Sequence, residues 1–245
     1  NEIFQNYKFK LIVHTAAQPS HDWAARDPLM DFEINASATL ALLENFRKYC
    51  PTAVFIFTST NKVYGDKPNL LKLMEFETRW DLTNSDPLYN GINEKMQIDD
   101  TTHSIFGVSK CSADLMVQEY GRYFNLNTGV FRGGCLTGPM HSATQMHGFL
   151  AFVVKSILSN SKYSIFGYKG KQVRDNIHAF DVVSMFDHFF MKPKQGVIYN
   201  IGGGRANSLS VIEAIKIIEE LSGEKANVEY VDNARIGDHK WYITD

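Results

Sequence analysis

Cysteine is scarce in this 245-residue chain, and its spacing excludes two kinds of stabilising site. The three residues Cys50, Cys111 and Cys135 are scattered, with no Cys-x-x-Cys pair. Disulfide frameworks and zinc sites use regularly spaced cysteines, so we expect neither. The eight histidines include no i,i+4 pair, and we expect no metal ion. This cysteine usage indicates a reducing cytosol.

The chain also lacks an excess of charge of one sign and a long apolar run. Its 25 Lys and Arg residues against 27 Asp and Glu residues give a formal net charge of -2, which argues against nucleic acid or an anionic membrane as a partner. No apolar run reaches the roughly 18 residues of a membrane helix. The composition does not exclude a small anionic ligand bound by a few arginines. With 44% hydrophobic residues, the composition is that of a soluble globular protein with a sizeable core.

Short apolar runs alternate with helical patterns along the chain. This alternation is typical of a doubly wound parallel α/β sheet. Residues 66–102 show no sustained period and many turn formers, so we expect a loop or lid there. We expect strands at 9–16, 53–58, 128–132, 163–166, 197–201 and 228–231, and helices at 27–49, 104–123, 149–158, 182–190 and, from a capping box, 210–223.

Two segments carry groups suited to chemistry. A hydroxyl-rich run, Thr58 to Thr60, follows the strand at 53–58, and ligands bind at the carboxyl ends of strands in such sheets. In the second segment, Phe106 precedes Lys110 by four residues, a spacing that puts both on one helix face. A tyrosine at the first position would have its pKa lowered by the lysine and could take a proton. Phenylalanine cannot.

These segments resemble extended short-chain dehydrogenase/reductases of the NAD-dependent epimerase/dehydratase family, and most of all the CDP-paratose 2-epimerases, also called CDP-tyvelose epimerases. Thr60 matches the family's catalytic Ser/Thr, Lys110 its lysine and Phe106 its tyrosine. Dehydratases of this class carry Asp-Glu after the threonine, whereas Asn61 and Lys62 stand here. The resemblance implies a Rossmann-like sheet with a smaller α/β substrate-binding lobe. A bacterial branch reads His-Ser-Leu-Phe-Gly-x-Ser-Lys, which favours a natural Phe106 over one introduced to trap a complex.

The resemblance implies NAD as the cofactor. The Gly-x-x-Gly-x-x-Gly turn that holds the cofactor pyrophosphate would lie before residue 1, and the sequence stops within a family motif. We therefore expect this chain to be a fragment that lacks its first βαβ portion. On its own, the 245-residue chain should bind NAD no more tightly than the millimolar range. The cofactor contacts implied within the chain are Ala16, Ala17, Gln18, Asn35, Thr58, Ser59, Lys110, Arg132 and Gly133.

A nucleotide-sugar substrate is implied as well. Arg174 lies in a match to the family's Arg-Asp-x-x-His-x-x-Asp stretch, where the arginine pairs with the substrate pyrophosphate. The resemblance assigns residues 1–132 to the remainder of the NAD-binding Rossmann domain and 133–245 mostly to a substrate-binding lobe, interleaved with late Rossmann elements. The substrate-binding residues implied are Asn61, Cys135, His147, Arg174 and Arg235, with Cys135 standing where an asparagine is usual.

The family reaction passes hydride from C2 of a CDP-linked dideoxy sugar to NAD and returns it to the other face, so a base must take the hydroxyl proton. Such general catalysis is worth roughly 10² to 10⁴ in rate. His103 is the first candidate to replace the missing phenol, because it lies three residues before Phe106. Weaker candidates are Tyr64, Tyr89, Cys135, His141 and His147.

Two alternatives stay open. Another nucleotide-sugar epimerase or oxidoreductase would share the same frame, and a noncatalytic sensor of NAD and a nucleotide sugar would explain Phe106. By analogy with relatives, the helices at 32–49 and 106–123 imply a homodimer or homotetramer. The resemblance also implies a cytoplasmic role in lipopolysaccharide O-antigen biosynthesis.

Overall fold

The computed structural model describes residues 2–144, 148–234 and 237–245, and the chain forms two compact units. The first unit comprises residues 1–65, 98–133 and 181–201. The second comprises residues 66–97, 134–180 and 202–245. Each unit is therefore assembled from three separate stretches of sequence.

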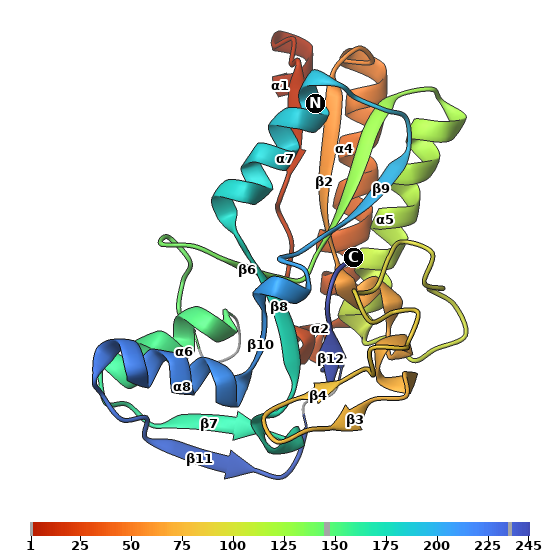
Figure 1. The fold of residues 1–245 in the computed structure, drawn as a ribbon. Coiled ribbons are helices and arrows are strands. Elements are labelled where there is room, and N and C mark those ends of the chain that lie inside the picture. The colour runs from red at the N-terminus through yellow and green to blue at the C-terminus, as the bar shows by residue number, and fades with distance from the viewer. Residues whose placement is uncertain (1, 145–147, 235–236) are drawn as a thin grey trace. The chain divides into compact units, whose positions relative to one another are not determined.

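A parallel sheet forms the centre of the first unit (Figure 1). Its strands are β1 (Leu11–His14), β2 (Val54–Thr60), β5 (Asn127–Gly133) and β9 (Val197–Ile201), in the order β1-β2-β5-β9. Val54 to Phe57 of β2 are all buried, as expected of an inner strand covered on both faces. Because all four strands run the same way, their carboxyl ends meet at one edge of the sheet.

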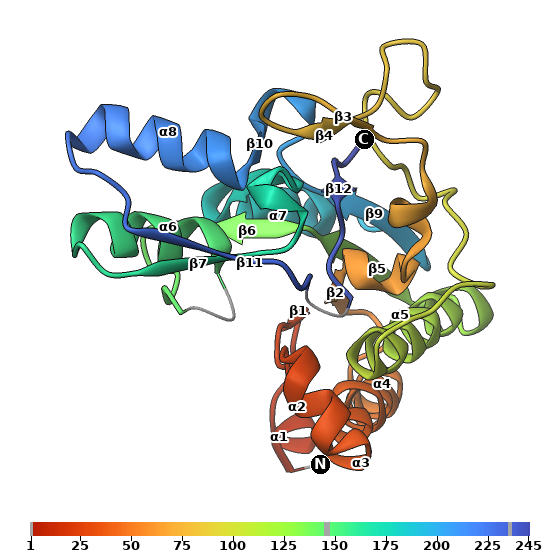
Figure 2. The same cartoon turned by 90° about the horizontal axis from the view of Figure 1, so that it is seen from below.

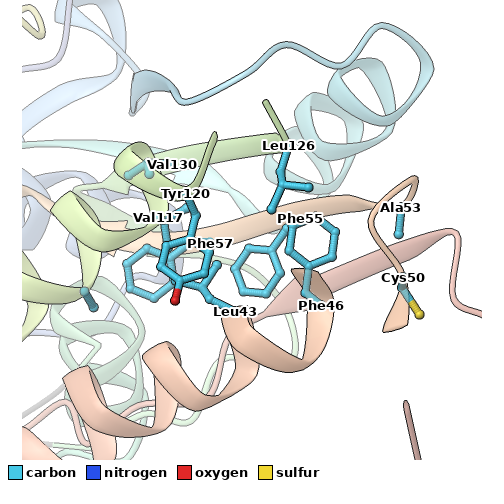
Figure 3. Packing of buried hydrophobic residues seen from close by; sticks show 11 residues of the cluster. Leu43, Phe46, Cys50, Ala53, Phe55, Phe57, Val117, Tyr120, Leu126 and Val130 are labelled. Carbon is cyan, nitrogen blue, oxygen red and sulfur yellow. The ribbon is translucent and has the colours of Figure 1, made fainter. Parts of the chain in front are cut away.

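Helices cover both faces of this sheet. Against one face, Leu43, Phe46 and Val117 pack on Phe55 and Phe57 (Figure 3). Burying each phenylalanine side chain contributes about 1.5 to 3 kcal/mol. The helical elements of the unit are α1 (Glu2–Asn6), α2 (His21–Arg26), α3 (Pro28–Phe32), the π-helical turn η1 (Glu33–Ser37), α4 (Ala38–Tyr49), the 3₁₀ turn η2 (Asn61–Tyr64), α5 (Ile105–Tyr123) and α7 (Ala179–Met191), which begins at the end of the second unit.

The opposite face of the sheet is covered by α7. Successive residues of a strand point to opposite faces, so Val130 joins the core beneath α4 and α5 while Phe131 points the other way. The Phe131 ring lies 4.9 Å from that of Phe186 and 5.6 Å from that of Phe189, centroid to centroid. The expected Rossmann-like fold class is confirmed by these two helical layers.

The second unit is built around β8 (Val173–His178), which pairs with three strands. It runs antiparallel to β10 (Ser208–Ser210) and parallel to β12 (Trp241–Tyr242) and β6 (Cys135–Thr137). A separate parallel pair joins β7 (Tyr163–Phe166) to β11 (Val228–Val231). The remaining elements are η3 (Lys67–Leu70), β3 (Met74–Glu75), β4 (Trp80–Asp81), α6 (Phe149–Leu158), the 3₁₀ turns η4 (Tyr168–Gly170) and η5 (Arg205–Asn207), and α8 (Val211–Ser222).

The α6 and α8 helices lie side by side and form a small core (Figure 2). Val153 and Ile157 of α6 pack with Ile218 of α8. The predicted capping box is confirmed, because the Ser210 side chain accepts from the backbone of Glu213 and the Glu213 side chain accepts from the backbone of Ser210. Gly223 ends α8 in the left-handed conformation that favours glycine.

Several elements differ from the sequence-based expectation. The expected helix at 27–49 is divided by the π-helical turn, and the segment 66–102, expected to be a loop, contains η3, β3 and β4. The strand β8 was not predicted, because its buried face carries Asp175 between Val173 and Ile177 and so interrupts the apolar alternation. The other unpredicted elements are α1, α2, β6, β10, β12 and the 3₁₀ turns η2, η4 and η5.

Candidate functional site

Lys110 is buried beside the carboxyl end of β2. Only 4% of the residue is exposed, and its Nζ donates to the backbone oxygen of Thr58 at 2.9 Å. The amine also lies 4.3 Å from the centroid of the Phe57 ring. Burial lowers the Lys110 pKa to about 8, although the charges of Asp114 and Asp31 oppose this shift. The amine is therefore mostly protonated at pH 7 but loses its proton at a lower pH than an exposed lysine does.

Phe106 lies one helical turn before Lys110 and is also buried. Ser104 caps the helix here by accepting from the backbone nitrogen of Gly107 at 3.0 Å. The Phe106 ring meets the His21 imidazole in an edge-to-face contact, with the ring centroids 4.9 Å apart. The imidazole of His21 and the Phe106 ring are thus in direct contact.

Thr60 ends β2 and begins the next turn. Its hydroxyl oxygen accepts from the backbone nitrogen of Lys62 at 3.3 Å and lies 3.4 Å from Oδ1 of Asn61. The residue is half-buried, and Asn61 beside it is buried. The Thr60 hydroxyl is therefore oriented by its own turn at the edge of the sheet where the strands end.

His103 lies before α5 rather than on its face, since the helix begins at Ile105. Its Nε2 is 2.8 Å from the backbone oxygen of Val63, and its Nδ1 is 3.2 Å from the backbone oxygen of Thr101. Carbonyl oxygens only accept hydrogen bonds, and a neutral imidazole has one N–H, so a neutral His103 donates to one of these two oxygens. Each ring nitrogen that could take a proton faces a backbone oxygen instead of a ligand.

A buried amide network holds the loop after β1. Asn35, in the π-helical turn, accepts from the Gln18 nitrogen at 2.9 Å and donates to Oδ1 of Asp31 at 3.0 Å and to Oγ of Ser109 at 3.1 Å. Gln18 Nε2 also donates to Asp31 at 2.6 Å. Single π-helical turns are frequent at functional sites, and this one joins the loop to α5.

Next to this network, β1 ends at His14, and the two alanines that follow it are exposed. Ala16 and Ala17 are exposed, so their backbone is accessible to a ligand. His14 Nε2 lies 2.9 Å from the Thr39 hydroxyl, which itself donates to the Asn35 backbone oxygen. Burial and the nearby charge of Lys110 lower the His14 pKa to about 4. His14 is therefore a neutral donor at physiological pH.

A buried ion pair lies behind the hydroxyl-rich run. Arg132 donates to both carboxylate oxygens of Asp114 at 2.9 Å, and Ser59 Oγ donates to the same carboxylate at 2.5 Å. Arg132 Nη1 also donates to the Tyr64 hydroxyl, which donates to Oδ1 of Asn200. Burial disfavours the charge of Arg132, yet the bonds to Asp114 outweigh this and raise its pKa. The side chains of Arg132 and Ser59 are thus engaged within the protein.

In the second unit, Arg174 forms an ion pair with Asp238 and donates to the Val173 backbone oxygen at 2.7 Å. The neighbouring Asp175 is fully buried and accepts from the backbone nitrogens of Gly204 and Thr244 at 3.0 Å each. Burial raises the pKa of Asp175. Asp175 thus fixes two turns to β8, while Arg174 is held beside a carboxylate.

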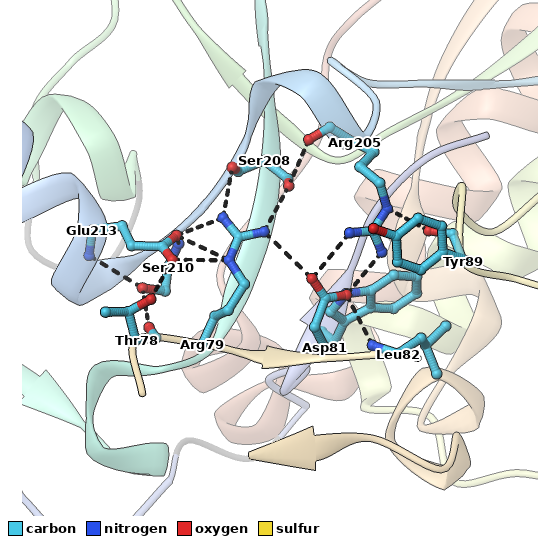
Figure 4. Close-up of polar contacts among 10 residues, drawn as sticks. Thr78, Arg79, Asp81, Leu82, Tyr89, Arg205, Ser208, Ser210 and Glu213 are labelled. Atoms are coloured by element: carbon cyan, nitrogen blue, oxygen red, sulfur yellow. Dashed lines mark hydrogen bonds and ion pairs between the residues drawn. The ribbon is translucent and has the colours of Figure 1, made fainter. Parts of the chain in front are cut away.

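A polar cluster that the sequence did not indicate fixes the segment 78–89 in the second unit (Figure 4). Arg205 binds both oxygens of Asp81 at 2.8 and 3.0 Å and stacks 3.6 Å above the Tyr89 ring. Arg79 pairs with Glu213 at 2.5 Å. Bidentate arginine–carboxylate pairs add geometric specificity, so this cluster fixes the conformation of the segment 78–89.

The remaining predicted residues are placed as follows. Cys135 begins β6 and is half-buried, Gly133 ends β5, and His141 follows β6. His147 and Arg235 lie outside the described residues. No group of three or more His, Cys, Asp and Glu side chains in the described ranges could hold a metal ion. Within the same ranges, no helix is both long and apolar enough to cross a membrane.

Sequence reasoning missed His21 and Asp114. Asp114 lies four residues after Lys110 on the same helix. This spacing places both side chains on one helix face, so the sequence alone could have predicted a charged partner for Lys110. His21 lies far from Phe106 in the sequence, and only the fold brings the two rings together.

Several proteins of known activity are similar to this chain in sequence and in fold. The chain is similar to the CDP-paratose 2-epimerase of Salmonella typhi, with 38% identity over 214 residues that cover 84% of this chain and 61% of the relative. Among solved structures, the UDP-glucose 4-epimerase of Thermotoga maritima with UDP-glucose is 26% identical, with a TM-score of 0.73, over 96% of this chain and 68% of that one.

A further solved structure is similar in fold although its sequence identity to this chain is low. The UDP-glucose 4-epimerase of Thermus thermophilus, in a complex with NAD, gives a TM-score of 0.79 at 21% identity, over the whole of this chain and 71% of that one. The chain thus spans about 60 to 70% of the length of these relatives. Residues 1–202 match the model of the NAD dependent epimerase/dehydratase family. The chain belongs to the NAD-dependent epimerase/dehydratase family.

Proposed function

We propose that the full-length protein is a nucleotide-sugar epimerase that inverts C2 of a CDP-linked dideoxyhexose, interconverting CDP-paratose and CDP-tyvelose. The observation that carries this proposal is the buried amine of Lys110 at the carboxyl end of β2, in a chain 38% identical to a CDP-paratose 2-epimerase. A buried lysine with a lowered pKa is characteristic of a functional site.

The described residues fit NAD as the cofactor. NAD, when bound, accepts hydride from the sugar and returns it. Lys110 would donate to the ribose hydroxyls, and the exposed backbone of Ala16 and Ala17 would lie beside the nicotinamide. Because Ser59 and Arg132 are engaged by Asp114, we propose that they shape the site through packing. The full proposed set is Ala16, Ala17, Gln18, Asn35, Thr58, Ser59, Lys110, Arg132 and Gly133.

We propose that Arg174 binds the diphosphate of the nucleotide. Arg174 forms an ion pair with Asp238. A guanidinium can bind a phosphate group in place of a carboxylate, because both offer oxygens in a similar geometry. On the grounds of the sequence resemblance, Cys135 would contact the sugar or base, and Asn61 and Thr60 would orient the sugar hydroxyl. His147 and Arg235 complete the proposed substrate contacts on sequence grounds.

We also propose that the protein acts as a cytoplasmic homodimer in O-antigen sugar synthesis. Leu40 of α4 and Val108 and Leu115 of α5 are exposed apolar residues, as expected of helices that pack against a second copy. Light scattering of the full-length protein should give twice the monomer mass. A monomer at micromolar concentration would contradict the dimer.

A noncatalytic sensor is the second candidate, and Phe106 is the observation that favours it. The buried ring has no hydroxyl to exchange a proton with the sugar. A sensor would still bind NAD and the nucleotide sugar, because Lys110 and Arg174 are present in either case. An enzyme would need another group to move the proton.

One experiment separates these functions. The full-length protein is incubated with NAD and CDP-paratose, and the sugar is followed by proton NMR. The proposal predicts new signals from the C2 epimer. A sensor would leave the sugar unchanged although it binds, and a different epimerase would act on UDP-glucose or UDP-glucuronate in a parallel reaction.

A further inference from the structure

The imidazole of His21 is a titratable group in direct contact with Phe106. The two ring centroids are 4.9 Å apart and the rings are inclined at 61°. His21 is half-buried, and its Nδ1 is a buried atom, so Nε2 is the nitrogen to consider for contact with a ligand. The imidazole is thus in direct contact with the side chain at position 106.

The position of His21 is fixed by the loop that carries it. Ser20 caps α2 by accepting from the Trp23 nitrogen at 3.2 Å, and Gln18 Nε2 donates to the Ser20 backbone oxygen at 3.0 Å. Gln18 is in turn bound to Asn35, and Asn35 donates to Ser109, the neighbour of Lys110. The same network therefore sets the distance between the His21 loop and the helix of Phe106 and Lys110.

Other candidate bases near Phe106 in this unit are engaged elsewhere. Both ring nitrogens of His103 face backbone carbonyl oxygens. The Tyr64 hydroxyl accepts from Arg132 and donates to Asn200. Lys110 donates to Thr58 and would be occupied by the cofactor ribose. His21 also interacts with the rest of the protein, and what distinguishes it is that its ring packs directly on the phenylalanine.

We propose that His21 is the catalytic acid/base of this protein and replaces the phenol missing at Phe106. This assignment depends on the proposed epimerase function. With NAD bound to take up the hydride of C2 and return it, a ring nitrogen of His21 would accept the C2 hydroxyl proton, which leaves a ketone and an imidazolium. The imidazolium would later return this proton to the same oxygen, so that the overall reaction is redox-neutral.

The test compares four forms of the full-length protein with NAD and CDP-paratose. In His21→Gln, kcat should fall by about 10² to 10⁴, as expected on loss of a general base, while KM changes little. His188→Gln, which alters an exposed histidine of α7, is the matched control and should keep wild-type turnover. Adding Phe106→Tyr to His21→Gln should restore turnover at least tenfold, because the phenol can then take the proton.

A second readout does not depend on turnover. With ¹³C-labelled histidine, the His21 ring signal is identified by its loss in His21→Gln, and it should shift when CDP-paratose is added to the NAD-loaded protein. Wild-type turnover in His21→Gln, no rescue by Phe106→Tyr in a folded double variant, or an unchanged ring signal would overturn the assignment. If the wild-type protein inverts no sugar at all, the proposed function itself fails, which is a separate outcome.

Discussion

Lys110 places an amine where a positive charge is unfavourable. The side chain is buried, and its pKa of about 8 lies below the usual 10.5 because burial disfavours the ammonium. This interval corresponds to roughly 3 kcal/mol of destabilisation of the charged form. Residues that reduce stability in this way are retained where function requires them, which agrees with a role for Lys110 in binding or catalysis.

Replacement of Lys110 by methionine should therefore stabilise the fold and abolish turnover. We expect Lys110→Met to raise the free energy of unfolding at pH 7 by about 1 to 3 kcal/mol, because a buried charge is exchanged for an apolar group of similar length. Urea denaturation at pH 7 measures this difference. A destabilised Lys110→Met would show that the ammonium contributes to folding.

The pH dependence of the same residue has a defined sign. The unfolded chain binds more protons at Lys110 than the folded chain between pH 8 and pH 10.5, so this residue makes stability rise with pH over that window. The destabilisation is fully present below pH 8. The difference in unfolding free energy between Lys110→Met and the wild type should consequently shrink as pH rises from 8 to 10.5.

The Arg132–Asp114 ion pair differs from Lys110, because each of its two buried charges is compensated by the other. Asp114→Asn leaves the guanidinium of Arg132 buried without its carboxylate, and such losses cost about 3 to 5 kcal/mol. Chemical denaturation should show this loss. Glu44→Gln, which breaks an exposed pair with Arg47, is the control and should leave the midpoint nearly unchanged. Equal effects of the two changes would contradict this account of the buried pair.

At the scale of elements, α5 carries Phe106 and Lys110, and it lies very close to β5 and to the residue that precedes β9. A Cβ on Gly121 would lie 2.2 Å from the backbone nitrogen of Gly196 and 2.3 Å from the Thr128 hydroxyl. Alanine favours a helix over glycine by about 1 kcal/mol, but overpacking against a fixed backbone costs about 1 to 3 kcal/mol. Contact therefore outweighs propensity here.

Gly121→Ala should accordingly destabilise the protein by about 1 to 2 kcal/mol in spite of its better helix propensity. Ser112→Ala on an exposed part of the same helix is the control, and it should change stability by less than about 0.5 kcal/mol. Thermal unfolding of both variants is the measurement. A Gly121→Ala variant as stable as the control would mean that α5 can move away from β5.

The elements that could be predicted from the sequence are those with a clear apolar period. The helix α6 and the strands β7, β9 and β11 have the predicted bounds, because their apolar residues lie together in sequence. β8 could not be predicted, since its central Asp175 is satisfied by backbone nitrogens from distant turns. In the site, Thr60 and Lys110 follow from local motifs, whereas the contact of His21 with Phe106 needs the folded chain.

At the scale of the whole molecule, each of the two units is built from three stretches of sequence. A cut between residues 132 and 133 would therefore separate segments that belong to one unit, because residues 181–201 supply β9 and most of α7 to the sheet of the first unit. The segment 78–89 is likewise joined by the Arg79, Asp81 and Arg205 cluster to residues that follow 202. Apolar periodicity does not reveal such polar contacts.

The most direct test of the account follows the hydrogen at C2. CDP-paratose labelled with deuterium at C2 is incubated in ordinary water with the full-length protein and NAD, and the product is analysed by NMR and mass spectrometry. Hydride transfer to a tightly held cofactor predicts the C2 epimer with its deuterium retained. Recovery of unchanged sugar, or of an epimer that has exchanged its deuterium for solvent hydrogen, would contradict a redox epimerase.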